Sequence, residues 1–119
     1  MAALVDPIRL AAYKDALCNW RVSGYVDFDL TDTAYNWLRG NFGNITLLEI
    51  KRLMHAFVMK GGVINEVQER RSNWTMHEYH YDLRFLIRNK PVYIETRLFY
   101  REPLVLDEST ILIVNIHSP

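Results

Sequence analysis

The stretch that decides the fold is Glu78–Tyr100, which reads EYHYDLRFLIRNKPVYIETRLFY. Two runs rich in aromatic and β-branched residues flank the short polar segment 88–90, a pattern typical of a β-hairpin. Because successive side chains of a strand point to opposite faces, the two runs predict one largely apolar face and one charged face. We therefore expect residues 78–87 and 91–100 to be paired antiparallel strands.

The register of this hairpin is predicted from its loop. If Asn89-Lys90 is a two-residue loop, Arg88 faces Pro91 and all other pairs follow. The expected partners are Phe85 with Ile94, Leu83 with Thr96, Tyr81 with Leu98 and Tyr79 with Tyr100 on the apolar face, and Arg84 with Glu95, Asp82 with Arg97 and His80 with Phe99 on the charged face. This register opposes unlike charges twice, which favours the pairing.

Composition limits the class of protein. The 119 residues suit one domain with one hydrophobic core, and half of them are apolar. The formal net charge is zero, which argues against sequence-independent binding to nucleic acid through bulk charge. The single cysteine, Cys18, excludes an internal disulfide framework and favours the cytoplasm. No apolar run is long enough to span a membrane, and the first residues do not resemble a signal peptide.

Three helices are expected before the hairpin, at about 7–19, 32–39 and 46–60. Their N-terminal signals are Asp6-Pro7, Thr31-Asp32 and the capping box Thr46-x-x-Glu49; their stops are Ser23-Gly24, Gly40 and Gly61-Gly62. The third helix carries an apolar stripe and is expected to cover the apolar face of the sheet.

Two further strands are expected at about 63–71 and 110–117. Residues 25–30 predict an extended connector or a short edge strand, residues 72–75 a turn, and residues 101–109 a loop. The order of the elements predicts an α+β domain, with N-terminal helices packed on one face of a roughly four-stranded antiparallel sheet.

The charged face is the candidate functional site. Its members under the predicted register are His80, Asp82, Arg84, Tyr93, Glu95 and Arg97, joined by Asn115 and His117 if Leu112, Val114 and Ile116 lie in the core. Histidine, tyrosine and arginine on one surface suit metal-free RNA cleavage, in which a base and an acid transfer protons and arginine stabilises the charged phosphorus centre.

Less specific interpretations remain for the same residues. The charged face could be a solvated lattice of ion pairs with no chemistry. The four histidines fit no standard ligand spacing, so no metal site and no cofactor are predicted. Cys18 is expected to be a small buried residue rather than a nucleophile, and most aromatic residues, Tyr81 and Tyr100 among them, are expected to pack in the core.

The C-terminal half is similar to a known family. Tyr81-x-Leu83, the turn, the run Val92-Tyr93-Ile94-x-Thr96-x-Leu98 and the final strand 111–117 resemble MqsR-type bacterial toxins of the RelE-like group, over roughly residues 46–117. The resemblance places Tyr93 at the family's tyrosine and His117 where the family has a basic residue. The chain differs in its neutral net charge, its longer 101–109 connection and its acidic Glu95.

The resemblance implies a small ribonuclease of a toxin–antitoxin pair that cleaves mRNA without a metal. His80 or His117 would transfer protons, Arg84 and Arg97 would bind phosphate, and Tyr93 would stack on or orient a base. The implied partners are mRNA or the ribosome and a cognate antitoxin; a homodimer is left open.

Two other functions remain as alternatives. The charged face or an exposed strand edge could bind another protein without catalysis. A curved sheet could instead enclose a small-ligand pocket lined by Tyr79, Tyr81 and Tyr100.

Overall fold

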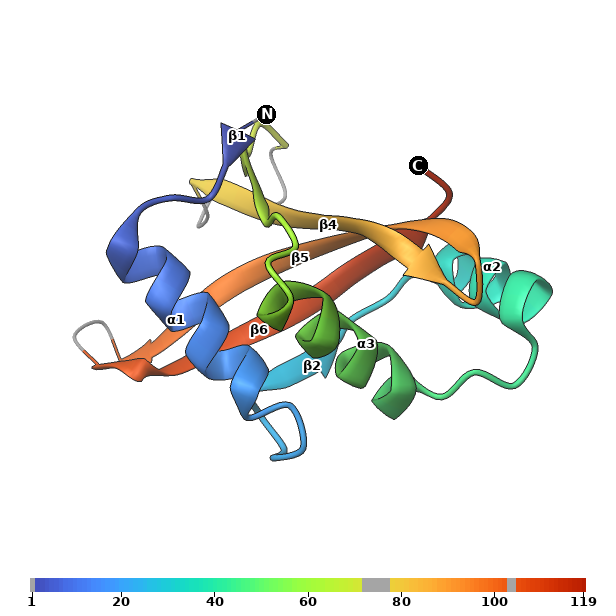
Figure 1. The fold of residues 1–119 in the computed structure, drawn as a ribbon, viewed down its shortest axis with the longest axis horizontal. Coiled ribbons are helices and arrows are strands. Elements are labelled where there is room, and N and C mark those ends of the chain that lie inside the picture. Colours follow the sequence, from blue (N-terminus) through green and yellow to red (C-terminus); the bar gives the residue numbers. More distant parts are fainter. Residues whose placement is uncertain (1, 72–77, 103–104) are drawn as a thin grey trace.

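The computed structural model describes residues 2–71, 78–102 and 105–119, with the backbone alone at 100–102 and 105–108. Its elements are β1 (Ala2–Ala3), α1 (Pro7–Cys18), β2 (Val26–Phe28), α2 (Asp32–Phe42), α3 (Leu47–Met59), β3 (Asn65–Gln68), β4 (Tyr79–Ile87), β5 (Lys90–Glu102) and β6 (Val105–His117). The strands form one sheet in the order β1-β3-β4-β5-β6-β2, and α1 and α3 lie across one of its faces (Figure 1). The fold is therefore α+β, as predicted.

The sheet is larger than predicted and is mixed rather than purely antiparallel. The four expected strands are β3 to β6, and neighbours among them pair antiparallel. Two short edge strands extend the sheet: β1 pairs antiparallel with β3, and β2 pairs parallel with β6. The segment 25–30 thus supplies the short edge strand that was one of its two predicted forms.

The helices begin where their capping residues predict. Each N-cap side chain accepts a hydrogen bond from the backbone N–H three residues on, which satisfies one otherwise unpaired donor. The three bonds join Arg9 N to Asp6 Oδ1 (2.9 Å), Ala34 N to Thr31 Oγ1 (3.2 Å) and Glu49 N to Thr46 Oγ1 (3.0 Å).

The helix ends agree with the sequence at α3 but not at α2. At α3, Gly61 N–H bonds the carbonyl of Val58 and Gly62 N–H that of Phe57, which is a Schellman motif, with Gly61 at φ +91°. The predicted stop of the second helix at Gly40 is wrong. The helix continues to Phe42 and ends at Gly43, whose φ of +60° reverses the chain direction.

The predicted register of the hairpin is wrong by two residues. The loop is Arg88-Asn89, with φ of 49° and 67°, and the pair that closes it is Ile87 with Lys90. Positive φ at both loop residues is typical of a type I′ turn. The residues flanking such a loop exchange two hydrogen bonds, and Pro91 has no N–H to give, so Lys90 takes that place.

A shift of two residues keeps every side chain on its predicted face but changes its partner. Leu83 pairs with Ile94 on the core face, and both are fully buried. On the other face Asp82 stands opposite Glu95, so the predicted pairing of unlike charges is wrong and two carboxylates meet instead. We call this second face, which also carries His80, Arg84, Tyr93 and Arg97, the charged face.

The expected alternation of the last strand is wrong in its first half, because β6 contains a β-bulge. Glu95 pairs with Asn115 but Thr96 pairs with Ile113, so Val114 is the extra residue. Beyond the bulge the alternation reverses: Ile111 and Ile113 lie in the core instead of Leu112, which stands opposite Arg97. Ile116 is buried as expected, and Asn115 and His117 lie on the charged face.

The predicted loop at 101–109 is largely strand. β5 continues to Glu102, β6 begins at Val105, and their pairing persists to Glu102 with Val105 through an irregularity after Tyr100. The first expected strand, 63–71, is shorter and covers Asn65–Gln68. The turn expected at 72–75 lies outside the described residues.

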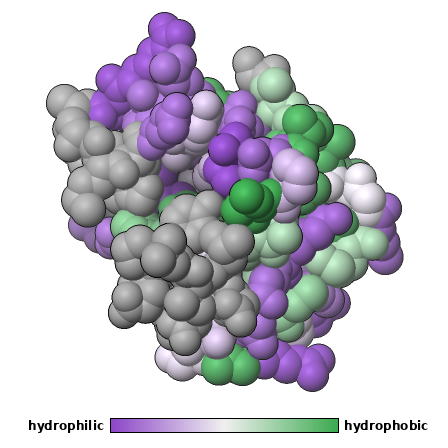
Figure 2. All heavy atoms as spheres, turned by 90° about the vertical axis from the view of Figure 1, so that its left-hand side faces the viewer, coloured by the Kyte–Doolittle hydropathy of each residue, from purple (hydrophilic) through white to green (hydrophobic). Residues whose placement is uncertain are grey.

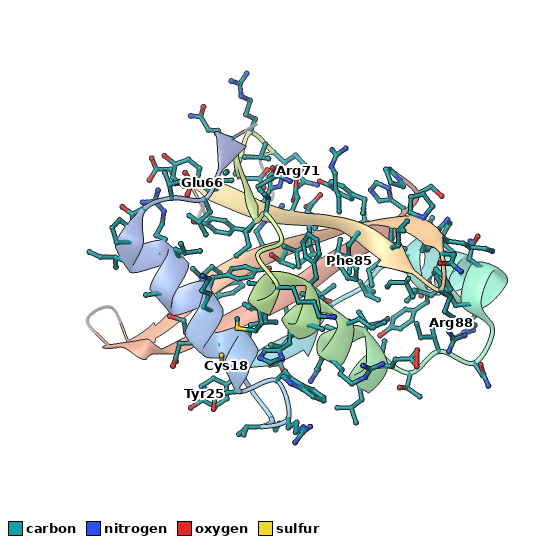
Figure 3. The ribbon with its side chains drawn as sticks, in the orientation of Figure 1. Cys18, Tyr25, Glu66, Arg71, Phe85 and Arg88 are labelled. Atoms are coloured by element: carbon teal, nitrogen blue, oxygen red, sulfur yellow. The ribbon has the colours of Figure 1, made fainter. Side chains whose placement is uncertain are left out.

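The core lies between the sheet and the helices α1 and α3. Tyr13 of α1 is fully buried, and its hydroxyl bonds Thr96 of β5 at 3.0 Å. Phe57 of α3 stacks on Phe85 of β4, which Figure 3 shows directed toward this helix. Helix α2 lies at the end of the sheet beside the β4–β5 turn (Figure 1), where Arg88 bonds the carbonyl of Phe42. Within the described ranges, no helix has the length and apolar character needed to cross a membrane.

Candidate functional site

Cross-strand rows of side chains organise the charged face. The first row runs Arg84, Tyr93, His117 across β4, β5 and β6; the second runs Asn65, Asp82, Glu95, Asn115 across β3 to β6. His80 stands in a third row opposite Val67, and Arg97 stands opposite Leu112. The five predicted site residues, His80, Arg84, Tyr93, Arg97 and His117, therefore share one face.

Asp82 joins His80 and Tyr93 into one hydrogen-bonded group. His80 Nδ1 lies 2.7 Å from Asp82 Oδ1, and the Tyr93 hydroxyl donates to Asp82 Oδ2 at 2.6 Å. Asp82 is 2% exposed, so both oxygens depend on these partners. Because an ionised carboxylate only accepts, His80 donates through Nδ1, which leaves its Nε2 as the proton-accepting atom.

The ring of Tyr93 lies between two other predicted site residues. The His117 ring stacks on it with centroids 4.6 Å apart, and the Arg84 guanidinium lies 5.1 Å from its centroid. Burial, with the hydrogen bond to Asp82, raises the pKa of Tyr93 well above its usual range. Tyr93 therefore keeps its proton at neutral pH and orients its neighbours; its ring is not open for a base to stack on.

His117 completes the group from the β6 side. Its Nδ1 lies 2.6 Å from the carbonyl oxygen of Ser118, which can only accept, so Nδ1 carries a proton. Its Nε2 has no hydrogen-bond partner within the described part of the chain. His80 and His117 are both partly exposed and Arg84 is exposed, whereas Asp82 and Tyr93 are buried. The accessible groups are thus two imidazoles and a guanidinium.

Arg97 lies beneath this surface rather than on it. Its side chain is fully buried and forms ion pairs with Glu69 at 2.5 Å and Glu95 at 2.8 Å. Arg71, half exposed, bonds the same two carboxylates from above. Arg97 is therefore a buried structural cation that, together with Arg71, balances the charges of Glu69 and Glu95, so it is not placed to bind phosphate.

Glu69 is held ionised by these arginines. Burial alone would raise its pKa, but the hydrogen bonds from Arg71 and the charge of Arg97 outweigh burial and lower the pKa of Glu69 to about 2. The carboxylate thus keeps its charge at neutral pH. This fixed charge positions Arg71 at the surface of the charged face.

The charged face also brings together three groups that could ligate a metal. His80, Asp82 and Glu95 each offer an atom within 4.8 Å of the other two. Glu95, however, is already paired with Arg97 and Arg71, and both Asp82 oxygens carry hydrogen bonds. Two guanidinium charges at one ligand repel a cation, so this set fits an ion-pair network better than a metal centre.

Two open hollows lie on the charged face on either side of Arg71. The His80 hollow, of about 470 Å³, is lined among the described residues by Val67, Gln68, Glu69, Arg70, Arg71 and His80. The Asn115 hollow, of about 400 Å³, is lined by Asp29, Leu30, Thr31, Arg71, Glu95, Val114 and Asn115. Figure 3 shows Arg71 just beyond the end of β3, and Figure 2 shows hydrophilic residues gathered at this upper end of the molecule.

Glu69 and Arg71 are the parts of the site that the sequence did not predict. Both fall in the predicted strand 63–71, but the observed strand ends at Gln68, and neither alternation nor spacing marks them as covering the sheet. Alternation predicts the face of Asp82 correctly but not its bonds to His80 and Tyr93. The alternative pocket of tyrosines gains no support, because Tyr81 packs in the core against Tyr13 and the Tyr100 side chain lies outside the described part.

Comparison of the chain with protein-family models, with curated proteins and with solved structures finds no match.

Proposed function

We propose that the charged face is a metal-independent endoribonuclease site. The observation that carries the proposal is the group in which Asp82 orients His80, the Tyr93 ring stacks on His117, and both imidazoles are partly exposed with no hydrogen bond at Nε2 within the described residues. Two partly exposed histidines and an exposed arginine on one face are the groups that transesterification of RNA needs.

In the proposed mechanism His80 is the base and His117 the acid. His80 Nε2 takes the proton of a ribose 2′-hydroxyl, whose oxygen then bonds the adjacent phosphorus. The bond from phosphorus to the 5′-oxygen breaks, and the protonated His117 gives its proton to that oxygen. The products are a 2′,3′-cyclic phosphate and a 5′-hydroxyl, and Arg84 stabilises the charge on the phosphorus centre.

The resemblance to MqsR-type toxins adds a cellular substrate and a protein partner to the proposal. The substrate would be mRNA in the cytoplasm, free or on the ribosome, and a cognate antitoxin would silence the activity by covering the charged face. Growth arrest on induction, relieved by a neighbouring gene product, is the expected behaviour.

The test uses purified protein and an mRNA in the presence of a chelator. We expect wild type to cleave, and His80→Gln and His117→Gln each to lower the rate by about 10²-fold or more, because each removes one proton-transfer group. Glutamine at 80 can still donate to Asp82, so the fold should persist. His55→Gln, on α3 and away from the charged face, is the matched control and should cleave like wild type.

Retained cleavage in the folded double variant His80→Gln, His117→Gln would contradict the mechanism. Absence of cleavage by wild type would instead favour a charged face that binds another protein without catalysis.

A further inference from the structure

The Asn115 hollow has the mixed lining that small-ligand sites use. Leu30 and Val114 supply apolar surface, while Asn115, Thr31 and Asp29 supply hydrogen-bonding groups. Its volume of about 400 Å³ lies in the range typical of such sites, roughly 300–1,000 Å³. The His80 hollow, by contrast, is lined mainly by polar and charged residues.

The polar groups of the Asn115 hollow still have bonding capacity. Among the residues that the structure describes, the side chains of Asn115 and Asp29 make no hydrogen bond or ion pair. Thr31 Oγ1 accepts from Ala34 N as the cap of α2, which leaves its hydroxyl proton to donate. Glu95, the other carboxylate of the lining, is paired with Arg97 and Arg71 and is not available.

The position of these groups is fixed by the sheet. Asp29 N–H bonds the carbonyl of Ile113, which continues the parallel pairing of β2 with β6 and holds the 29–31 segment beside the bulge. Asn115 pairs with Glu95 beside the bulge residue Val114, and this pairing holds its amide on the charged face.

We infer that the Asn115 hollow binds a guanine base of the RNA, with the adjoining phosphate on Arg71. This inference rests on the proposed function, because it names which nucleotide the site selects. The Watson–Crick edge of guanine presents N1–H and N2–H₂ side by side, and one carboxylate accepts from both. Asp29 is the carboxylate of the hollow that has no partner among the described residues, and the amide of Asn115 can donate to guanine O6.

No other standard base presents two adjacent N–H donor groups on that edge. Adenine and cytosine each place a lone-pair nitrogen beside their amino group, and that nitrogen would face the Asp29 carboxylate. Uracil flanks its one N–H with two carbonyl oxygens. The hollow therefore discriminates by leaving a polar group of the wrong base without a partner.

Arg71 connects the base site to the reacting groups. Its side chain is half exposed and lines both hollows, so a strand with its base in the Asn115 hollow passes its phosphate over Arg71 toward His80. The ion pairs with Glu69 and Glu95 hold the guanidinium in place, which lowers the ordering cost of a phosphate contact.

Titration of the full chain with the four nucleoside 3′-monophosphates tests the inference. We expect guanosine 3′-monophosphate to bind most tightly, and Asp29→Asn to weaken its binding by about tenfold or more while the other three change little. Asp32→Asn is the matched control: it removes a neighbouring exposed carboxylate outside the hollow and should keep the guanosine preference.

Equal binding of the four nucleotides by wild type, or a preference that survives in folded Asp29→Asn, would overturn the inference. These outcomes are separate from the cleavage assay. Guanosine preference without RNA cleavage would refute the proposed function and keep the base site, and cleavage without guanosine preference would do the reverse.

Discussion

Two buried carboxylates, Asp82 and Glu95, stand opposite each other on β4 and β5, and the structure stabilises them by different means. Two arginines neutralise Glu95, whereas Asp82 receives a tyrosine hydroxyl and an imidazole. Like charges in directly opposed positions destabilise a sheet unless each is compensated. The compensation explains why the charged face is polar yet largely buried.

Tyr93 tests this interpretation at the residue scale. Tyr93→Phe keeps the ring between His117 and Arg84 but leaves Asp82 Oδ2 without its donor. We expect the free energy of unfolding to fall by about 1–3 kcal/mol, because a buried acceptor loses its partner. Urea denaturation of the variant beside wild type measures the change.

The matched control is Tyr35→Phe on α2, which removes a hydroxyl that makes no hydrogen bond within the described residues. Its stability should stay within about 0.5 kcal/mol of wild type. Equal stability of Tyr93→Phe and Tyr35→Phe would show that the Tyr93–Asp82 bond contributes nothing.

At this scale the sequence predicted which face each hairpin residue occupies, but not its partners. Alternation alone assigns Asp82, Tyr93 and Arg97 to the charged face, since the period of a strand is two. Their partners depend on register and on Glu69 and Arg71, which reach the sheet from beyond a strand end. Such a contact leaves no local sequence pattern.

At the scale of the element, local signals predicted helix starts well and the hairpin register poorly. A cap is decided by residues three apart, as in the bonds of Thr31 and Thr46. The register depends instead on which two residues form the loop of the hairpin, Asn89-Lys90 or Arg88-Asn89. The missing N–H of Pro91 decides for Arg88-Asn89, and this criterion is contained in the sequence itself.

Alanine should change the stability in opposite directions at two glycines, Gly62 just after α3 and Gly40 inside α2. A Cβ at Gly62 would lie 2.5 Å from the Phe57 ring, which is itself stacked on Phe85, so Gly62→Ala should destabilise by about 1–3 kcal/mol. Gly40 lies inside α2 with nothing within 4 Å of an added Cβ, so Gly40→Ala should stabilise by about 0.5–1 kcal/mol.

Thermal unfolding of both variants gives the comparison, with Tm lowered for Gly62→Ala and raised for Gly40→Ala. A Tm for Gly62→Ala at or above that of wild type would mean that the α3 end is not packed as described.

For the whole molecule, the order of helices and strands was enough to predict the α+β class but not the full sheet. The strands β1 and β2 have two and three residues, too few for a period to show. They join the sheet only because β3 and β6 offer edges to them, which is a property of the assembled fold. The end of α2 also depends on the assembled fold. It lies three residues beyond the predicted end, because the local sequence offers Gly40 and Gly43 equally as helix stops.

The ion pairs of Glu69 predict how the stability of the fold depends on pH in the acid range. Its pKa is about 2 in the folded chain and ordinarily 4.5, so the unfolded chain binds more protons between these values. The stabilisation is complete above pH 4.5 and is lost as the pH falls toward 2. We expect Tm to fall through this window, and Glu69→Gln to flatten the fall.

Glu78→Gln, which removes an exposed carboxylate just before β4, is the control and should keep the wild-type pH profile. A Glu69→Gln variant with an unchanged acid profile would contradict the role given to the Arg71 and Arg97 pairs.

The measurement that tests the central claim most directly is end-group analysis of an oligoribonucleotide incubated with purified wild-type protein and a chelator. The proposed mechanism, with His80 as base and His117 as acid, requires fragments that end in a 2′,3′-cyclic phosphate and begin with a 5′-hydroxyl. Intact RNA, or cleavage that appears only with added metal and leaves 5′-phosphates, would contradict it.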